Sequence, residues 1–453
     1  MPSKQTLIAT NRFGLGATPA DIERAKDKPK AWLKSQIKSS TAMPSLFSDQ
    51  PSSADILRQS YENRRVKDEA SRKALNKKKR QGFNQALRTR LKYQVQTDQP
   101  FAERLVRFWS NHFTVSRTRG LIGPALPAYE NEAIRPFIFG QFEELLLNVT
   151  QHPCMLIYLD NISSIGPNSR QGSRRGKDLN ENLAREILEL HTMGAQGDYT
   201  QSDVTNFAKI LTGWTVARQR KKPKNQKAPP GQFFFNPRTH EPGPKEILGK
   251  SFKQGGVNQG IEALKYISHH PSTARFVATK LVRHFIDDTP SAGDIQKIEQ
   301  VFIKTKGDLA VVSEALIDLK SAWDMSGSKI KTPEELMIST LRAMTTKYAL
   351  KLPRRQLLFP ALKSMGQEIF RAPSPAGWPD KGEAWIAPES LTHRLEWIRA
   401  FSRQSPGDIN PVSIFNQTIA PFATEDAARL IKGAPSRADG LALIFSSPAF
   451  QRR

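Results

Sequence analysis

The 453-residue sequence contains a single cysteine, Cys154, which excludes an intramolecular disulfide and a multi-cysteine metal cluster. Cys154 lies in the apolar stretch PCMLIYL, a setting typical of a buried structural thiol rather than of a nucleophile. No window approaches 18 apolar residues, so we expect no membrane-spanning helix. The start, MPSKQTLIATNRFGLG, contains neither the apolar core of a secretory signal nor a twin-arginine pair, and this predicts a cytoplasmic location.

Several common catalytic motifs are also missing. The sequence has no His-Glu-x-x-His zinc motif, no Gly-x-Ser-x-Gly nucleophile elbow and no Glu-x-x-His pair of the kind found in di-iron bundles. The stretch GPKEILGKS resembles a phosphate-binding P-loop, but five residues separate Gly243 from Gly249 where that motif requires four. We therefore exclude a P-loop nucleotide site, and the sequence predicts no particular metal or cofactor.

Positive charge is abundant. The chain has 68 Lys and Arg against 43 Asp and Glu, which gives a net charge of +25. Such a field attracts polyanions, whether nucleic acid, anionic lipid headgroups or acidic polysaccharide. The hydrophobic fraction of 38% is below the globular average of about 45–50% but far above that of disordered chains, so a packed core is expected.

Local patterns predict a mainly α protein: a large multi-helix body with one small β-hairpin around residues 232–252 and long basic loops. Thr18 before a proline and the capping box of Thr332 with Glu335 are helix-start signals. The segment FFFNPRTHEPGPKEILGKSF has two short runs around turn-forming residues, as in a hairpin. We predict one unit over 1–453, with N-terminal helices (1–62), a basic helical insertion (63–98), a central helical core (99–217), a basic loop and hairpin (218–256) and a C-terminal helical region (257–453).

The stretch NENLAREILELHTMG places acidic groups and a histidine close together on one predicted helix. At 100° per residue, Asn182, Glu186 and Glu189 form one stripe, with Arg185 beside it, whereas His191 falls on the opposite, apolar side. The two glutamates could share a proton or a metal ion. They could equally form a solvated acidic face with Arg185 as their salt-bridge partner. His191 is expected to be a core residue.

Two other histidines are candidates for acid–base chemistry. His112 lies in the aromatic helix segment WSNHF, where a histidine is more often structural. His240 lies beside Glu241 in the polar turn NPRTHEPGPK, where we expect it to be exposed and free to act.

Two basic segments could bind phosphates or sulfates, or could serve as solubilising surface. One is the run from Arg64 to Lys92, predicted to be a long, exposed amphipathic helix. The other is a loop that contains Arg218, Arg220, Lys221, Lys222 and Lys224. Aromatic residues are sparse in both, so stacking on nucleic-acid bases is not indicated.

Taken together, these segments resemble the bacterial domain-of-unknown-function 1800 family almost end to end. The resemblance runs through ATNRFGLGATPADIE, RFWSNHFTVS, PCMLIYLDN, NENLAREILELHTMGAQGDYTQSDVTNFAKILTGWT, HHPSTARFVATKLVRHF, GWPDKGEAWI and SSPAFQRR. It implies a mainly helical protein. It also implies a sulfatase-like partner, of the domain-of-unknown-function 1501 family, whose genes often lie nearby and whose members often carry twin-arginine signals, so that co-export to the periplasm is an alternative location. Many relatives have Phe at the position of His191, which argues against a ligand role there.

The leading hypothesis is an enzyme with hydrolase-like acid–base chemistry that acts on an anionic envelope or extracellular polymer. Glu186 would act as acid and base with His240 or His112 opposing it, and Arg185 and the basic loops would hold the substrate. The alternatives are a non-catalytic helical adaptor for the sulfatase-like partner and, from charge alone, a non-specific nucleic-acid binder. The polar and aromatic residues in the family-like motifs are His112, Asp160, Asn161, Asn182, Arg185, Glu186, Glu189, Tyr199, Trp214, His240 and Trp378.

Overall fold

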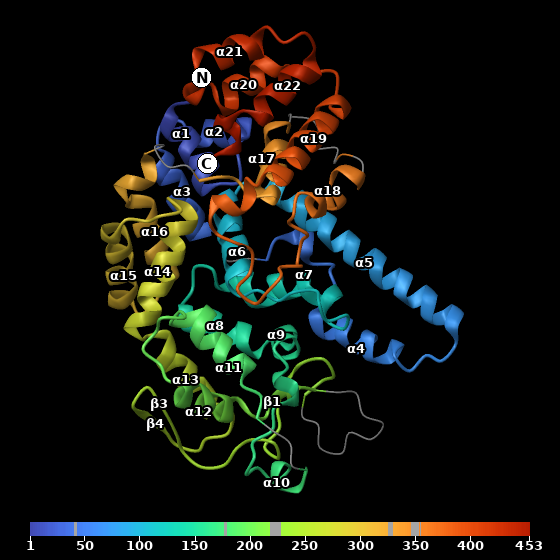
Figure 1. Ribbon diagram of the computed structural model, residues 1–453, viewed down its shortest axis with the longest axis vertical. Coiled ribbons are helices and arrows are strands. Elements are labelled where there is room, and N and C mark those ends of the chain that lie inside the picture. Colours follow the sequence, from blue (N-terminus) through green and yellow to red (C-terminus); the bar gives the residue numbers. More distant parts are fainter. Residues whose placement is uncertain (40–42, 176–178, 218–227, 325–328, 346–352, 354) are drawn as a thin grey trace.

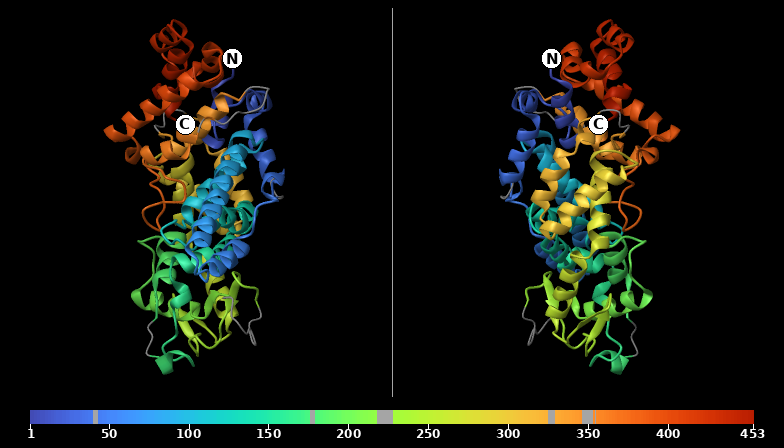
Figure 2. Two further views of the ribbon diagram at one scale, coloured as in Figure 1. Left: turned by 90° about the vertical axis from the view of Figure 1, so that its right-hand side faces the viewer. Right: turned by 90° about the vertical axis from the view of Figure 1, so that its left-hand side faces the viewer.

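The computed structural model describes residues 1–39, 43–175, 179–217, 228–324, 329–345, 353 and 355–453. The molecule is elongated and built almost entirely of helices, with both chain ends in its upper half (Figures 1 and 2). The expected mainly α fold is therefore confirmed. The predicted basic loop from Arg218 to Lys224 lies outside the described residues.

The N-terminal helices are α1 (Lys4–Ile8), α2 (Pro19–Ala25), α3 (Pro29–Ser39), α4 (Ser53–Asn63) and α5 (Glu69–Gln96). The centre of the chain forms α6 (Pro100–His112), α7 (Leu126–Tyr129), α8 (Phe142–Gln151), α9 (Pro153–Tyr158), α10 (Gly172–Arg175), α11 (Asn182–Glu186) and α12 (Gln201–Leu211). Then follow α13 (Val257–Ser268), α14 (Pro271–Phe285), α15 (Ala292–Thr305) and α16 (Leu309–Asp318). The C-terminal helices are α17 (Pro333–Ala343), α18 (Phe359–Ser364), α19 (Pro388–Gln404), α20 (Pro411–Thr418), α21 (Glu425–Lys432), α22 (Arg437–Ser446) and α23 (Pro448–Gln451).

Side-chain caps fix where many of these helices begin. The Thr18 side chain accepts a hydrogen bond from the amide of Asp21 at the start of α2. At the start of α17, Thr332 and Glu335 each accept from the other's backbone amide, which completes the predicted capping box. Such caps satisfy amides that have no partner within the helix.

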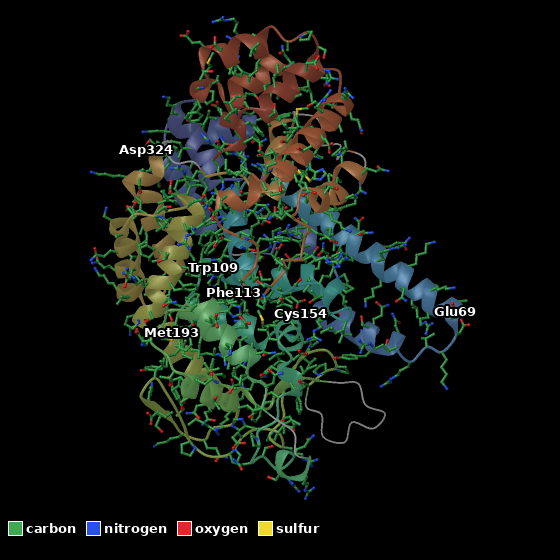
Figure 3. All side chains as sticks on the ribbon, in the orientation of Figure 1. Glu69, Trp109, Phe113, Cys154, Met193 and Asp324 are labelled. Atoms are coloured by element: carbon green, nitrogen blue, oxygen red, sulfur yellow. The ribbon has the colours of Figure 1, made fainter. Side chains whose placement is uncertain are left out.

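The larger of two hydrophobic cores surrounds α6, which is buried along most of its length. Trp109 stacks on Phe113, and both lie inside the body in Figure 3, as does the buried Cys154. Burial raises the pKa of the Cys154 thiol well above its ordinary value, in keeping with the expected structural role.

A second core lies among the C-terminal helices at the top of Figure 1, where α17 to α22 pack with the last turns of α5. The fully buried guanidinium of Arg342 on α17 joins this core to the N-terminal helices. Its Nε donates to the carbonyl of Gly16 at 3.0 Å, its Nη1 donates to the carbonyls of Gln94 and Val95, and its Nη2 pairs with Asp21 on α2.

Helix α5 projects from the body together with α4 (Figure 1). Its buried residues begin at Phe83 and continue through Leu87 and Leu91, whereas the first half of the helix is largely exposed. Glu69 marks the outer end of the projection in Figure 3. The long basic helix predicted over residues 64–92 is present, but it begins at Glu69 and ends at Gln96, and its second half packs into the body instead of being exposed.

The β structure of the described residues comprises two small antiparallel sheets. Strand β3 (Lys245–Ile247) and strand β4 (Lys250–Phe252) form the predicted hairpin, and Leu248 and Gly249 both have positive φ at its turn, as two-residue hairpin turns require. The first predicted run, β2 (Phe233–Phe235), instead pairs with β1 (Trp214–Val216), a partner that precedes the basic loop. The predicted range therefore contains the hairpin and one strand of a second sheet.

Candidate functional site

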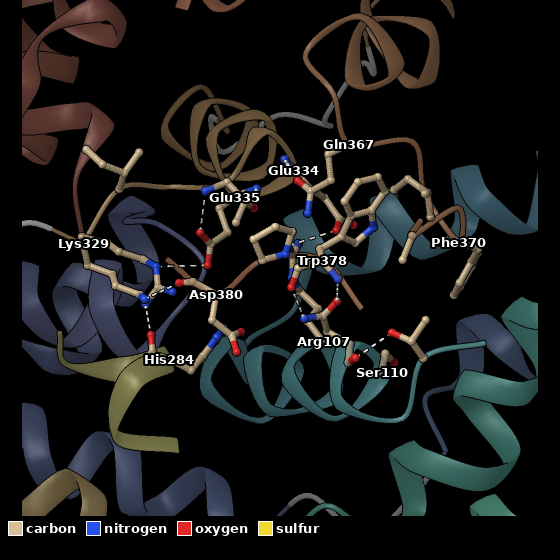
Figure 4. A pocket seen from close by; sticks show the side chains of 18 of the residues that line it. Arg107, Ser110, His284, Lys329, Glu334, Glu335, Gln367, Phe370, Trp378 and Asp380 are labelled. Atoms are coloured by element: carbon tan, nitrogen blue, oxygen red, sulfur yellow. Dashed lines mark hydrogen bonds and ion pairs between the residues drawn. The ribbon is translucent and has the colours of Figure 1, made fainter. Parts of the chain in front are cut away.

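A pocket of about 100 Å³ lies between α6, the residues leading into α17 and the segment around residues 367–380 (Figure 4). Since one water molecule needs roughly 10–15 Å³ measured in this way, the pocket has room for a small ligand. His284 and Lys329 lie on one side of it, and Gln367 and Phe370 on the other (Figure 4).

One face of α6 supplies the floor of the pocket. Arg107, Ser110 and Asn111 are three and four residues apart, so they project from the same side of the helix. Asn111 holds Trp378 at the rim, because its Nδ2 donates to the Trp378 carbonyl at 2.9 Å and its Oδ1 accepts from the Trp378 amide at 2.7 Å. A side chain at Gly377 would bring its Cβ within 2.5 Å of the Asn111 carbonyl oxygen, so this close approach requires glycine.

The carboxylates in the pocket wall are already paired with cations. Glu334 accepts from Arg90 at 2.5 Å and from Arg107 Nη2 at 3.0 Å. Glu335 lies 2.5 Å from Arg104. Asp380 pairs with Lys280 on α14.

Cations outnumber these acids around the pocket. Arg90, Arg107, Lys329 and Arg453 line it, and the buried side chains of Arg104 and Lys331 lie behind. Burial lowers the pKa of Arg104 to about 9, and the positive charge of Arg453 acts in the same direction. Burial also lowers the pKa of Lys331 to about 7. Burial and the neighbouring positive charges therefore both disfavour the charged forms of Arg104 and Lys331.

The same positive charges change the pKa of Glu335, which lies among these cations. Burial alone would raise the pKa of Glu335, but Arg453 and Arg104 outweigh burial and hold that pKa well below its usual range. Glu335 is therefore ionised and serves as a counter-ion rather than as a proton donor.

Apart from Nε of Arg453, which lies 3.1 Å from a carboxylate oxygen of Glu335, two buried nitrogen atoms of the pocket wall have no hydrogen-bond partner in the part of the chain that the structure describes. They are Nη1 of Arg107, whose side chain is only 10% exposed, and Nε2 of His284. Burial, together with Arg453 and Arg104, lowers the pKa of His284 well below its ordinary value, so its imidazole is neutral. Leaving such groups unpaired costs about 1–3 kcal/mol each. A ligand oxygen can accept a hydrogen bond from Arg107 Nη1, and from His284 Nε2 in the tautomer that carries the proton there.

The predicted site residues are distributed over several regions, and Trp378 is the one found in the wall of this pocket. His112 is 3% exposed, and its Nε2 lies 2.9 Å from the carbonyl oxygen of His191. Burial lowers the pKa of both imidazoles to about 3. His191 faces the core, as the helical wheel predicted, although residues 187–192 form a π-helical turn rather than a continuation of α11.

The expectation that His240 is exposed is wrong. The residue is 7% exposed, its Nδ1 lies 2.9 Å from the Thr212 carbonyl oxygen, and its ring packs edge-on against Phe235. The turn folds inward because the Lys245 ammonium donates to three successive backbone carbonyls, those of residues 241 to 243. Burial lowers the pKa of His240.

Glu186 is half-buried, and burial together with the charge of Glu189 raises its pKa. Arg185 opposes this shift, but its guanidinium pairs with Glu181 at 3.0 Å and with Gln201 at 2.8 Å. The interpretation of Arg185 as the salt-bridge partner of the acidic stripe therefore needs correction, because the carboxylate that it pairs with among the described residues is that of Glu181.

The neighbours of that stripe are tyrosines and an exposed amide. Burial and the charge of Glu186 raise the pKa of Tyr158 to about 12, and burial followed by Glu189 raises that of Tyr199. Asn182 is exposed at the start of α11. In the described residues, no hydrogen bond or ion pair joins Glu186 to His112 or His240.

Three further candidates take part in the fold around β1. Asn161 is 2% exposed, and its Nδ2 donates to the carbonyls of Trp214 at 2.8 Å and Leu211 at 3.2 Å. Trp214 is fully buried against Gly260, where an added Cβ would lie 2.4 Å from the indole ring. Asp160 has a positive φ of 58° and pairs with Arg119.

Sequence reasoning did not identify most of the pocket. Arg107 lies in the same motif as His112, RFWSNHF, and its i, i+3, i+4 spacing with Ser110 and Asn111 was a usable signal. Glu334 and Glu335 lie in TPEELM. This pattern predicts the start of a helix, and it does not indicate that both acids are also counter-ions of arginines.

No group of three His, Cys, Asp or Glu side chains is arranged to hold a metal ion within the described ranges. None of the described helices combines the length and the apolar character needed to cross a membrane.

Comparison with known proteins gives one match. Residues 8–452 match a family model described as "Protein of unknown function (DUF1800)". Neither the curated proteins nor the solved structures include a match to the chain. Because the family model covers nearly the whole sequence, this chain belongs to the DUF1800 family.

Proposed function

We propose that this protein binds an oxyanion-bearing unit of an anionic polymer in the pocket between α6 and α17. One observation carries the proposal: Nη1 of Arg107 and Nε2 of His284 in the pocket wall have no partner among the described residues, while the carboxylates of the pocket are already paired. A site with spare donors and occupied acceptors favours a ligand that only accepts hydrogen bonds.

The surroundings of the pocket support a sugar acid as that unit. The ring of Trp378 at the rim and that of Phe370 in the wall offer apolar faces, on which the C–H face of a sugar can rest. The positive charge of Arg90, Arg107, Lys329 and Arg453 complements a carboxylate. The same positive charges would repel a cationic ligand.

Calorimetric titration with D-galacturonate tests the proposal, with galactose as the uncharged comparison. Arg107→Gln should weaken galacturonate binding about tenfold or more, because a charge-assisted hydrogen bond contributes about 1.5–3 kcal/mol. His284→Phe removes the other unpaired nitrogen without changing a charged group, and should weaken binding by a smaller factor.

Arg399→Gln, on the exposed surface of α19, is the matched control for the loss of one positive charge. Its affinity should equal that of the parent protein. Equal binding of galactose and galacturonate, or an Arg107→Gln variant with parental affinity, contradicts the proposal.

A catalytic role for Glu186 is a second proposal, supported by its raised pKa beside Glu189. Raising the pKa of a carboxyl group favours its protonated form, and this is the form that can act as a general acid. Glu186 and Glu189 are three residues apart on the same stripe, and Tyr158 lies close enough for its pKa to respond to Glu186. Glu186→Gln should fail to complement a gene deletion, while Asn182→Ala, on the same face, should complement it; full complementation by Glu186→Gln refutes catalysis there.

The adaptor hypothesis has its own supporting observation. Leu391 and Leu395 are 40% and 47% exposed, and they are one helical turn apart on α19. Their substitution by Ser should abolish co-purification with the sulfatase-like partner, whereas Leu430→Ser on α21 should not. Fractionation of cells with and without the partner distinguishes a cytoplasmic location from periplasmic co-export.

A further inference from the structure

Helix α5 joins the pocket to the projecting part of the molecule. Arg90 of α5 is in the pocket wall, where its Nε and Nη2 bind Glu130 at 2.8 and 3.0 Å. From Arg90 the helix runs outward to Glu69 (Figures 1 and 3), a length of about 30 Å at 1.5 Å per residue. We call residues 64–82 the basic arm.

The charge of the basic arm is unbalanced. Residues 64–82 contain nine Lys and Arg and two acids, Asp68 and Glu69. Both acids are engaged, since Asp68 caps α5 through the amide of Ser71 at 2.7 Å and Glu69 pairs with Lys73 at 2.8 Å. Lys77, Lys78 and Arg80 therefore face solvent and have no counter-ion among the described residues.

The arm gains little from packing. The first buried residue of α5 is Phe83, so the helical part of the arm has no apolar stripe. Like charges one turn apart, such as Lys73 and Lys77, repel each other and destabilise an isolated helix. A bound polyanion would remove this repulsion.

A series of side-chain and backbone contacts connects the arm to the pocket. The ring of Phe370, in the pocket wall, lies 5.4 Å from the Arg90 guanidinium, and its carbonyl accepts from the Arg117 amide at 2.7 Å. The Arg117 guanidinium lies 4.9 Å above the ring of Phe83 on α5. One turn further out, Lys79 donates to the carbonyl of Gly120 at 3.2 Å. Cations thus follow one another from the pocket to the arm, and of these Arg117 also pairs with Glu368 at 3.6 Å.

We propose that this row of cations, the α5 track, holds the chain of an acidic polysaccharide whose terminal unit occupies the pocket. The track consists of Arg117, Lys77, Lys78, Lys79 and Arg80. The inference rests on the proposed function, since it takes the pocket ligand to be one end of a polymer. It adds the path of the remaining units and the charge that recognises them.

The track favours a polysaccharide over a nucleic acid. Residues 64–82 contain no aromatic residue, and Phe83 is 7% exposed beneath Arg117. Proteins that hold single-stranded nucleic acid gain much of their affinity from bases stacked on aromatic side chains. A pocket of about 100 Å³ accepts a single small unit, whereas the end of a duplex is far too wide for it.

Oligogalacturonates of increasing length test the track. For the parent protein, affinity should rise about tenfold or more from the monomer to the octamer, because each added unit binds as part of an already tethered ligand. The triple variant Lys77→Gln, Lys78→Gln and Arg80→Gln should bind the monomer with parental affinity and lose most of the gain with length. Lys77, Lys78 and Arg80 are exposed, so the variant should unfold at the parental temperature.

The matched control removes the same charge from another part of the surface. Lys297→Gln, Lys304→Gln and Lys320→Gln alter exposed residues on α15 and after α16, on the side opposite the arm in Figure 1. This control should keep the full dependence on ligand length. Equal losses in the two triple variants would show that net charge, rather than the track, governs binding.

Failure of the inference is distinguishable from failure of the proposed function. If the monomer binds through Arg107 but affinity does not change with length, the track is refuted and the pocket proposal stands. If neither monomer nor octamer binds, both are refuted. If an oligothymidylate of equal charge competes equally well and depends on the same three arm residues, the occupant is nucleic acid and the polysaccharide assignment is overturned.

Discussion

Acidification should destabilise the protein through histidines that its core keeps neutral. His112 and His191 both have a pKa of about 3 in the folded chain because of burial, and their ring centroids are 6.2 Å apart. In the unfolded chain each imidazole has a pKa near 6.5. Between these values the unfolded state binds protons that the folded state does not, so stability falls as the pH decreases through 6.5.

The size of this effect follows from the two pKa values. Lowering the pH from 7.5 to 5.0 should cost about 2 kcal/mol for each histidine, or about 4 kcal/mol for the pair. His191→Phe removes one of the two contributions, together with two buried ring nitrogens that have no partner among the described residues. Relative to the parent, this variant should therefore gain about 2 kcal/mol between pH 7.5 and pH 5.0.

Urea unfolding at the two pH values, with extrapolation to zero denaturant, measures these free energies. Phe276→Leu is the control, because it changes packing beside the His112 ring without removing a titrating group. It should alter stability equally at both pH values. A His191→Phe variant whose stability relative to the parent is independent of pH would falsify the assignment of a depressed pKa to His191.

Three further predictions concern single residues. Gly377→Ala should lower the unfolding free energy by about 1–3 kcal/mol and weaken galacturonate binding, because φ is +83° there and a Cβ would meet the Asn111 carbonyl; calorimetry of unfolding and of binding checks both. Asn161→Ala should cost about 2 kcal/mol, since it leaves the Trp214 carbonyl unpaired, and thermal denaturation measures the loss. Lys331→Met should be more stable than the parent at pH 7, and its advantage should shrink by about 3 kcal/mol toward pH 10. The reason is that Lys331 has a pKa of about 7 in the folded parent but near 10.4 in the unfolded chain, so the unfolding free energy of the parent rises with pH over this range. Urea titrations at both pH values measure the difference between the two proteins, and a constant difference would contradict the prediction.

Features that depend on nearby residues were predictable from the sequence. The caps at Thr18 and Thr332 each depend on a few neighbouring side chains, and the structure confirms them, whereas the hairpin found within the predicted range turns at Leu248 and Gly249 and not between the two predicted runs. The position of His191 also followed from helical geometry. Local chemistry decides such features before any tertiary contact forms.

Features that depend on distant partners were not predictable in this way. His240 lies in a polar turn, but Lys245 and Thr212 draw it inward, and the turn sequence alone does not encode that burial. The pocket combines side chains from α5, α6, α17 and the segment near Arg453, and no motif spans such separations. Glu334 and Glu335 lie in a helix-start motif, and that motif does not predict that arginines of α5 and α6 neutralise them.

The contacts of Arg342 determine how the protein can be divided for study. The guanidinium sits on α17, but its partners are Asp21 and the backbone of residues 16, 94 and 95. A fragment consisting of the C-terminal helices alone would lose these partners and would expose to water the apolar side chains that pack against Leu15, Leu91 and Val95. The C-terminal third should consequently not fold as an isolated recombinant fragment, and useful shortened versions must retain α2 and the end of α5.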